Sequence, residues 1–346
     1  MNSKERFQAA LNLETPDRVP LLYQHLGGGE WVLQSAGKSL MEGFQSPEAF
    51  AEIAMASQRL FEFDNVMVGW GDILIEAQAH GAKWAFKDKN QYPHVEAYVP
   101  FTPESIERIQ PVDPLKDEYW SVPLRAAGIL QEKIGEGIEV VGCINAPFII
   151  ASEVIGYDKI MVAPRKNPKE AHKLFETITE SAKIYADRIA QDYGLDTLFI
   201  VDGTAGADQI GLDFCTQFDL YYVGKLIDHC RSLGLKTIIQ NGSSAPYLEA
   251  QAALKPDAIH FNNRAVDLAK TFDMFRQRLC VVSGIDHMEL LLRGTPDDVE
   301  REVQRAVDLY GKASGLMLAA GAEMGFKTPV ENIRRLKEAA ARYGSY

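Results

Sequence analysis

Polar side chains follow the apolar runs that recur along the sequence, and most of them carry carboxyl, amide or imidazole groups. Carboxyl groups could transfer protons, and amides could orient a substrate oxygen. Any one of these residues could equally cap a helix or bond a loop amide, so we interpret the set as a whole. The candidates are Gln24, His25, Asp72, Asn145, Asp202, Gln240, Asn241, Asn262, Asn263, Asp286 and Glu323.

Aromatic side chains accompany these polar ends and could bury a ring-sized ligand. Most aromatics beside strands belong to a core, so each is a weaker candidate than the set. They are Tyr23, Trp70, Phe148, Phe261 and Phe326.

The elements that must position these side chains are short apolar segments without polar alternation, as expected for parallel strands covered on both faces. Helical patterns lie between them, and Ser46-Pro47, Thr102-Pro103, Thr295-Pro296 and Thr328-Pro329 predict helix starts. The expected strands are 19–26, 65–72, 138–145, 197–203, 236–242, 257–262, 279–286 and 315–321.

Eight alternations of strand and helix predict an α/β fold, a (β/α)8 TIM barrel. The barrel has an N-terminal extension and an excursion over 83–113, after the second strand, which we interpret as a β-hairpin or lid over the barrel mouth, with a plain surface connection as the alternative. An open doubly wound sheet is the alternative, but it needs a Gly-rich phosphate turn that the sequence lacks. No linker or repeat divides the chain, so we expect one domain over 1–346.

The charge and the cysteine content indicate which kinds of molecule the protein could bind. The net charge is −12, with 36 basic and 48 acidic residues, which argues against nucleic acid and anionic membranes. The four widely spaced cysteines form no CxxC pair, and the sequence contains no long apolar segment. We therefore expect a cytoplasmic protein that acts on small molecules.

In sequence order, the ends of the segments and their flanks resemble the uroporphyrinogen decarboxylase superfamily over nearly the whole chain. The resemblance rests on Glu5–Leu11 with Pro16–Pro20, on Gly71–Leu74 with Glu76-Ala77 and His80–Ala82, and on later matches. The later matches are Ala146–Phe148, Val201–Gly203, Gly284–Asp286, Leu291–Val299 and Thr328–Ile333. Dimers are common in the family, which implies a homodimer here.

The family contains porphyrinogen decarboxylases and methyltransferases that work with corrinoid proteins, and the decarboxylase pattern is incomplete here. The arginine-rich segment that grips substrate carboxylates corresponds to Leu22–Leu26, without arginine. The decarboxylases' late histidine aligns with Ala322, and their serine with Gly203. The resemblance therefore favours the methyltransferase branch, with decarboxylation as the alternative.

Methyltransferases that activate thiols hold zinc through an HxC pair and a later cysteine. Aligned on Gly242, these positions are Ile239, Asn241 and Ala322, so zinc-thiolate chemistry on coenzyme M is disfavoured. The chain also lacks a DxHxxG cobalamin signature, which implies that the corrinoid arrives on a partner protein. The resemblance thus implies methyl transfer from a small donor, with an aryl methyl ether as one candidate, to that corrinoid.

Cobalt attack on a methyl ether needs an acid at the leaving oxygen, and Asp72, Asp202 and Glu323 are the predicted catalytic carboxyls. We expect such proton transfer to contribute roughly 10²–10⁴ in rate. A metal held by His25, Asp202, His260 and Glu323 is an alternative source of acid. A barrel that only binds a small ligand is the non-catalytic alternative.

Overall fold

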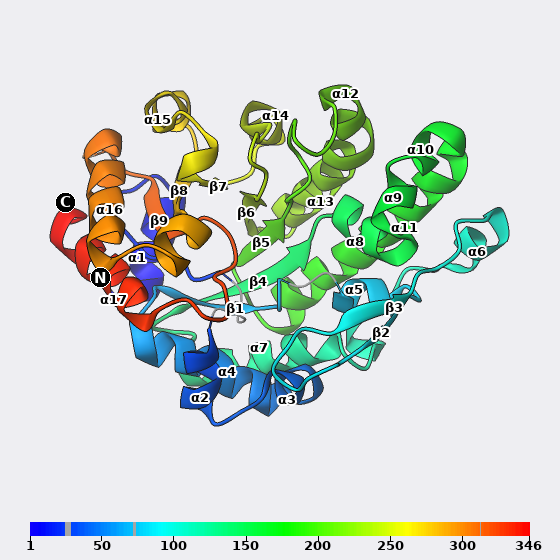
Figure 1. Cartoon of the computed structure of the whole chain (residues 1–346), viewed down its shortest axis with the longest axis horizontal. Coiled ribbons are helices and arrows are strands. Elements are labelled where there is room, and N and C mark those ends of the chain that lie inside the picture. The colour runs from blue at the N-terminus through cyan, green and yellow to red at the C-terminus, as the bar shows by residue number, and fades with distance from the viewer. Residues whose placement is uncertain (25–28, 72–73, 312) are drawn as a thin grey trace.

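The structure is a computed structural model that describes residues 1–24, 29–71, 74–311 and 313–346. Within these residues, seven parallel strands follow one another around a curled sheet (Figure 1). Each agrees with a predicted segment within a few residues. They are β1 (Asn65–Val68), β4 (Glu139–Asn145), β5 (Thr197–Val201), β6 (Lys236–Asn241), β7 (Ala258–Asn262), β8 (Cys280–Ile285) and β9 (Leu316–Ala320).

The predicted first strand is only partly formed, but it closes the sheet into a barrel. Leu21 makes a parallel bridge to Leu318 of β9, and the Leu22 amide donates to the Leu318 carbonyl at 2.9 Å. On the other side, the Asp64 amide donates to the Leu21 carbonyl at 2.9 Å. Pro20 has no amide hydrogen, which limits the pairing of this segment. The predicted TIM-barrel class is confirmed, and the open sheet is not observed.

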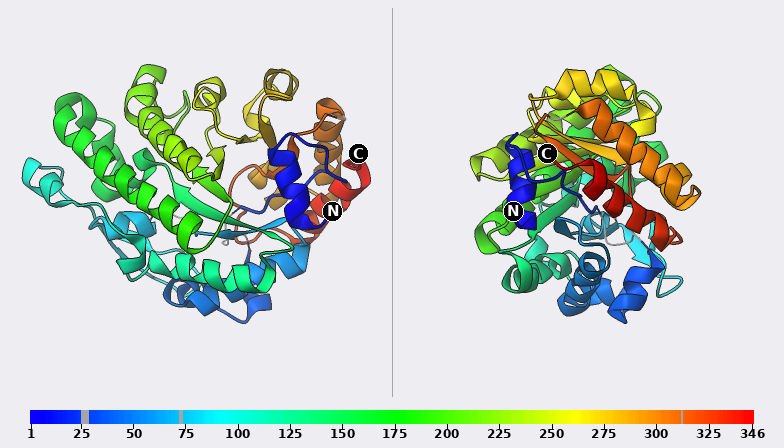
Figure 2. Two further views of the ribbon diagram at one scale, coloured as in Figure 1. Left: turned by 180° about the vertical axis from the view of Figure 1, so that it is seen from behind. Right: turned by 90° about the vertical axis from the view of Figure 1, so that its left-hand side faces the viewer.

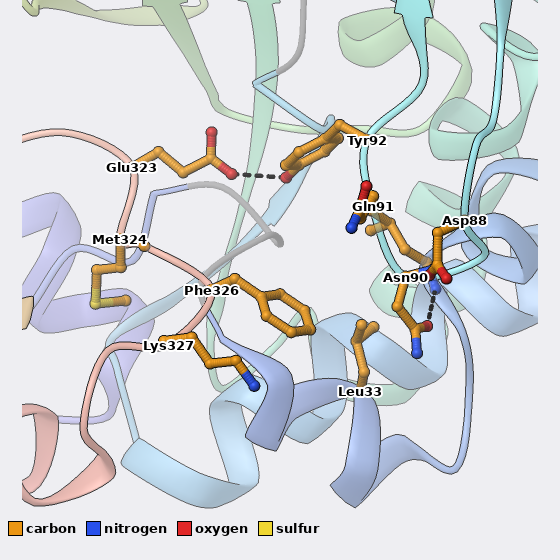
Figure 3. A pocket seen from close by; sticks show the side chains of 11 residues that line it. Leu33, Asp88, Asn90, Gln91, Tyr92, Glu323, Met324, Phe326 and Lys327 are labelled. Atoms are coloured by element: carbon orange, nitrogen blue, oxygen red, sulfur yellow. Dashed lines mark hydrogen bonds between the residues drawn. The ribbon is translucent and has the colours of Figure 1, made fainter.

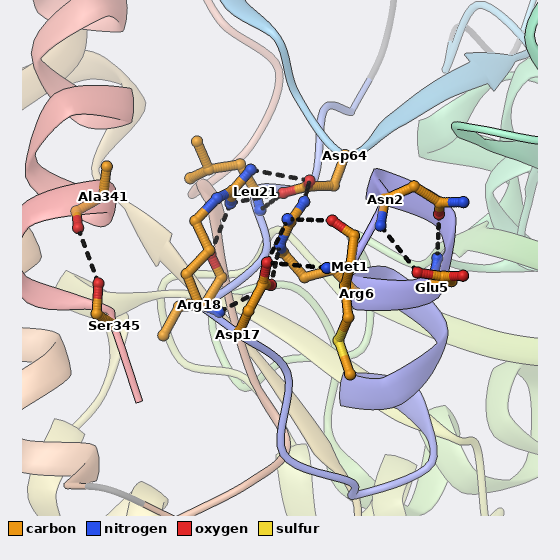
Figure 4. Close-up of polar contacts among 11 residues, drawn as sticks. Met1, Asn2, Glu5, Arg6, Asp17, Arg18, Leu21, Asp64, Ala341 and Ser345 are labelled. Carbon is orange, nitrogen blue, oxygen red and sulfur yellow. Dashed lines mark hydrogen bonds and ion pairs between the residues drawn. The ribbon is translucent and has the colours of Figure 1, made fainter.

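A buried ion cluster fixes this segment in place (Figure 4). The Asp64 carboxylate is fully buried and accepts hydrogen bonds from Arg6, from Arg18 and from the Leu21 amide, at 2.7–3.0 Å. Arg6 also forms an ion pair with Asp17 at 2.6 Å. The Glu5–Leu11 and Pro16–Pro20 motifs therefore have a physical role, because their arginines hold the closing segment against the start of β1.

Helices cover the outside of the barrel, and one helix closes its amino-terminal end. The α1 helix (Ser3–Leu11) places Phe7 in the same buried cluster as inward side chains such as Met67, Val141 and Phe199. The main outer helices are α4 (Pro47–Phe61), α7 (Ser121–Ile134), α11 (Pro168–Asp187), α13 (Tyr221–Ser232), α15 (Leu268–Phe275), α16 (Pro296–Tyr310) and α17 (Val330–Tyr343). Figure 2 shows α1 next to the N-terminus and α17 next to the C-terminus.

The predicted excursion is a β-hairpin, as expected. Its strands are β2 (Lys83–Ala85) and β3 (His94–Ala97), and the short helix α6 (Pro103–Arg108) projects beyond it (Figure 1). Other short helices are α2 (Glu30–Ala36), α3 (Leu40–Gln45), α5 (Leu74–Ala79), α8 (Pro147–Ile155), α9 (Tyr157–Ile160), α12 (Leu212–Cys215) and α14 (Leu248–Ala252).

The predicted helix starts are confirmed at Ser46, Thr102 and Thr295, whose side chains accept from backbone amides. The prediction at Thr328 is wrong: α17 begins at Val330, and the Thr328 hydroxyl is buried without capping it. None of the helices in the described ranges is long and apolar enough to cross a membrane.

Candidate active site

Glu323 lies where two cavities meet at the carboxyl-terminal end of the barrel. The first, of about 470 Å³, is the barrel mouth, lined by Gly71, Asn145 and Val201 at strand ends. The second, of about 680 Å³, lies between the hairpin tip, α2, α3 and the segment 323–327. Glu323 lines both cavities, so it can contact ligands in either.

Tyr92, at the tip of the hairpin, reaches across to this carboxyl group. Its hydroxyl donates to Glu323 Oε1 at 2.6 Å, a contact between residues 231 positions apart (Figure 3). A hydrogen bond of this length holds both groups in a defined geometry. Tyr92 is not among the predicted site residues. The one feature of the sequence that could have indicated it is its position inside the predicted hairpin or lid.

The second cavity is mainly apolar, with a few polar groups. Phe326, Leu33, Leu40 and Met324 supply the apolar surface, and Figure 3 shows Phe326 and Leu33 facing the same space as Tyr92. The polar groups Asp88, Asn90, Gln91 and Lys327 line its edge. This combination is typical of sites for small ligands with a ring. Phe326, a predicted binding residue, lines this cavity.

Asn145, a predicted binding residue, lines the barrel mouth beside Glu323. Its side chain is 1% exposed and its Nδ2 donates to Glu76 Oε1 at 3.0 Å, while its Oδ1 has no partner within the described residues. The Oε1 atoms of Gln24 and Gln240 are likewise buried without a partner there. Gln24 Nε2 donates to the Ala320 carbonyl at 3.2 Å.

His260 and Asn262 occupy the barrel interior on β7. His260 is buried, its Nε2 lies 2.9 Å from the Ala320 carbonyl, and its ring lies 6.0 Å from that of Phe199. Asn262 donates to Asp286 at 2.9 Å. Gly284 and Gly321 leave the space these side chains need, since a Cβ on Gly284 would lie 3.0 Å from His260 Nε2 and one on Gly321 2.8 Å from Asn262 Cγ.

Asp202 and Asn241 do not line either cavity that Glu323 lines. Gln251 of α14 links them: its Nε2 donates to Asp202 at 2.6 Å, and its Oε1 accepts from Asn241 at 2.8 Å. Successive strand residues point to opposite faces, so Asp202 and Asn241 lie toward the helices while Gln240 points inward. The structure therefore places two of the predicted residues behind the strand ends.

Asp202 forms a buried carboxyl pair with Asp219, between α12 and α13. Both side chains are fully buried. Burial raises the pKa of Asp202 to about 6, although the hydrogen bond from Gln251 opposes the shift. Burial and the charge of Asp202 raise the pKa of Asp219 well above its ordinary value. The pair thus holds a proton near neutral pH, but it does so outside the cavities.

The other predicted residues have structural partners. Asp286 accepts from the Met288 and Glu289 amides and so caps the next turn, and Asn263 bonds Glu302 and Ser283. Trp70 stacks on Phe44 at 4.2 Å, Phe148 stacks on Phe175 at 5.7 Å, and Tyr23 lies 5.2 Å from Phe63. Asp72 and His25 lie outside the described residues.

Of the proposed metal ligands, Asp202, His260 and Glu323 lie in the part of the chain that the structure describes, where no three His, Cys, Asp or Glu side chains could hold an ion. Two residues of this chain align with positions that hold zinc in thiol-activating methyltransferases. Ile239 is an apolar core residue, and Asn241 donates hydrogen bonds through its Nδ2 to Gln251 and to the Ala205 carbonyl. These residue types do not fit a zinc-thiolate centre.

The comparisons with known proteins cover the whole chain. The uroporphyrinogen decarboxylase (URO-D) family profile matches residues 2–343. The chain is 26% identical to "Methylcobamide:CoM methyltransferase MtbA" of Methanosarcina mazei, over 98% of each chain. It is 23% identical to a uroporphyrinogen decarboxylase of Anaeromyxobacter dehalogenans, over 98% of this chain and 99% of the other.

A solved structure described as a methyltransferase from Methanosarcina mazei superposes with a TM-score of 0.87, at 23% identity and over 99% of each chain. This likeness supports the barrel fold. The predicted resemblance is confirmed by the family match, and the relatives with methyltransferase names agree with the predicted branch. The chain belongs to the uroporphyrinogen decarboxylase family.

Proposed function

We propose that this protein is a methyltransferase that moves a methyl group from an aryl methyl ether to the cobalt of a corrinoid bound to a separate protein. The observation that carries the proposal is the position of Glu323 at the junction of two cavities. One cavity opens at the barrel mouth, where a large partner can approach. The other is an apolar chamber that suits the ring of a small donor.

The names of the full-length relatives support a corrinoid as the partner in methyl transfer, since several are methylcobamide:CoM methyltransferases. In those names the methylated corrinoid is the donor, and transfer toward the corrinoid is the direction that we propose for this chain. The chemistry of the site supports an ether donor. Attack by cobalt(I) on the methyl carbon breaks the carbon–oxygen bond and leaves negative charge on oxygen, which is a poor leaving group unless it is protonated. A carboxyl group between donor and acceptor meets that need.

In this mechanism Phe326, Leu33 and Met324 hold the ring, and the methyl carbon faces the mouth. Glu323 gives its proton to the leaving oxygen, and the Tyr92 hydroxyl keeps the carboxyl group in place through the 2.6 Å hydrogen bond. Asn145, held by Glu76, lines the mouth side of the same junction. Asp72, which the resemblance places in the family's essential segment, is a further proposed acid.

The test supplies reduced corrinoid protein with candidate ethers and follows the cobalamin spectrum. Formation of methylcobalamin from an aryl methyl ether is expected with the wild-type protein. We expect Glu323→Gln to lower the rate by roughly 10²–10⁴ while donor affinity changes little. Glu331→Gln is the matched control, because Glu331 is exposed on α17.

The absence of methylcobalamin with every donor would overturn the proposal. Ligand binding without turnover would instead favour the non-catalytic barrel. Loss of carboxyl groups from a porphyrinogen would favour the decarboxylase alternative.

A further inference from the structure

The barrel mouth has an unusual balance of charge. Its charged side chains among the described residues are carboxyls, Glu153 and Glu323, and no lysine or arginine of that part of the chain lines it. His94 and Tyr98 of the hairpin complete its polar lining. A cavity of this kind favours a ligand that is positively charged or that donates hydrogen bonds.

Glu153 stands out within its helix. The segment Pro147–Ile155 is otherwise apolar, so Glu153 is the one charged residue of α8. It is partly buried, and it has no hydrogen bond or ion pair with any described residue. It also lies two residues before the helix ends, where the helix dipole disfavours negative charge. Burial raises the pKa of this carboxyl group.

Partial burial and the nearby helix end both disfavour a negative charge on Glu153, and no described residue offsets this cost with a hydrogen bond or an ion pair. Asn145 gives an independent indication of a ligand at the same place. It is 1% exposed, it lines the same cavity, and its Oδ1 is a buried acceptor without a partner among the described residues. Carboxyl groups and a residue whose acceptor has no partner among the described residues thus line the same mouth.

The methyl acceptor changes its charge during the proposed reaction. Cobalt(I) bound by the monoanionic corrin ring gives a core with no net charge. Cobalt uses its electron pair to form the bond to the methyl carbon, and the bond from that carbon to oxygen breaks. The oxygen keeps that electron pair and takes the proton of Glu323. The cobalt is then formally cobalt(III), and the methylated core carries one positive charge.

Resting on the proposed function, we propose that Glu153 stabilises the positive charge that the corrin core gains as it accepts the methyl group. Negative charge develops on the donor oxygen, which Glu323 protonates, and positive charge develops on the acceptor side, which Glu153 faces. Groups placed where charge develops lower the barrier because they need no rearrangement during the reaction. Glu153 is therefore a catalytic residue distinct from the acid.

The experiment measures binding of two corrins without a protein carrier. Methylcobinamide carries a core charge of +1, and dicyanocobinamide is neutral. We expect the wild-type protein to prefer methylcobinamide, and Glu153→Gln to reduce the ratio of the two affinities on the order of tenfold, the effect of one partly screened charge. Asp158→Asn is the control, because it removes an exposed carboxylate of α9 that does not line the mouth.

Glu153→Lys should reverse the preference, and Glu153→Gln should slow methyl transfer by a similar factor without changing donor affinity. An unchanged affinity ratio in Glu153→Gln would overturn this inference and leave the proposed function intact. If neither corrin bound to the wild-type protein, the corrinoid acceptor of the proposed function would fail as well.

Discussion

The buried pair Asp202 and Asp219 leads to a prediction about stability that depends on pH. Because burial and the charge of Asp202 raise the pKa of Asp219, the folded protein holds a proton that the unfolded chain releases above the ordinary value of 3.8. Stability is therefore lost as pH rises from 3.8 toward the folded pKa. Asp219→Asn keeps a hydrogen-bond donor beside Asp202 and removes the need for this proton.

The magnitude follows from the pH interval. Neutral pH lies about 3 units above the ordinary pKa, and each unit corresponds to about 1.4 kcal/mol, so the substitution stabilises by at most about 4 kcal/mol at pH 7. We expect a gain below this limit, because the amide reproduces the hydrogen bonds of the acid imperfectly. The gain should shrink toward zero as pH approaches 4.

Urea unfolding of both proteins between pH 5 and pH 8 tests this expectation. The difference in unfolding free energy should rise with pH by up to about 1.4 kcal/mol per unit, since one proton is involved. Asp213→Asn is the control, because Asp213 is exposed on α12, and its difference should be flat. A flat difference for Asp219→Asn, or a less stable protein at pH 8, would refute the explanation. Cys215, whose thiol lies 3.8 Å from Asp219, stays protonated over this range because burial raises its pKa.

Three further changes test the closure of the barrel, its interior and the site. Asp64→Asn should destabilise by about 3–5 kcal/mol in urea unfolding, because it leaves buried arginine charge without its partner, whereas the more exposed Asp17→Asn should cost less. Gly284→Ala should destabilise by about 1–3 kcal/mol, since its Cβ would lie 2.4 Å from the Phe261 carbonyl oxygen, while Gly211→Ala, with open space, should not. Tyr92→Phe should slow methyl transfer about tenfold with unchanged thermal stability, and an unchanged rate would remove the positioning role of its hydroxyl.

The sequence predicted the barrel well because its strands are buried on both faces. Runs such as Thr197–Val201 show this directly, and their helices carry clear apolar stripes. The segment 19–24 was harder to predict, because its apolar composition resembles a strand while Pro20 limits the ladder to one bridge.

The candidate site was less predictable, for a geometric reason. Adjacent polar residues at a strand end, such as Gln240 and Asn241, point to opposite faces, and the sequence does not say which one faces inward. Tyr92 and Glu153 come from a hairpin and a short helix, not from a strand end. Glu153 did leave a signal, a lone charge in an apolar helix, but its cavity depends on tertiary packing.

The way the barrel closes has a consequence for biosynthesis. Leu22 is hydrogen-bonded to Leu318, so a segment that is translated early has to wait for one that is translated much later before it can pair. Until then α1 and the arginines that hold Asp64 lack part of their binding surface, and the incomplete sheet exposes two unpaired edges. Contacts so distant in sequence form slowly, and open edges associate with other chains. We therefore expect nascent chains of this protein to need protection by chaperones until β9 has emerged.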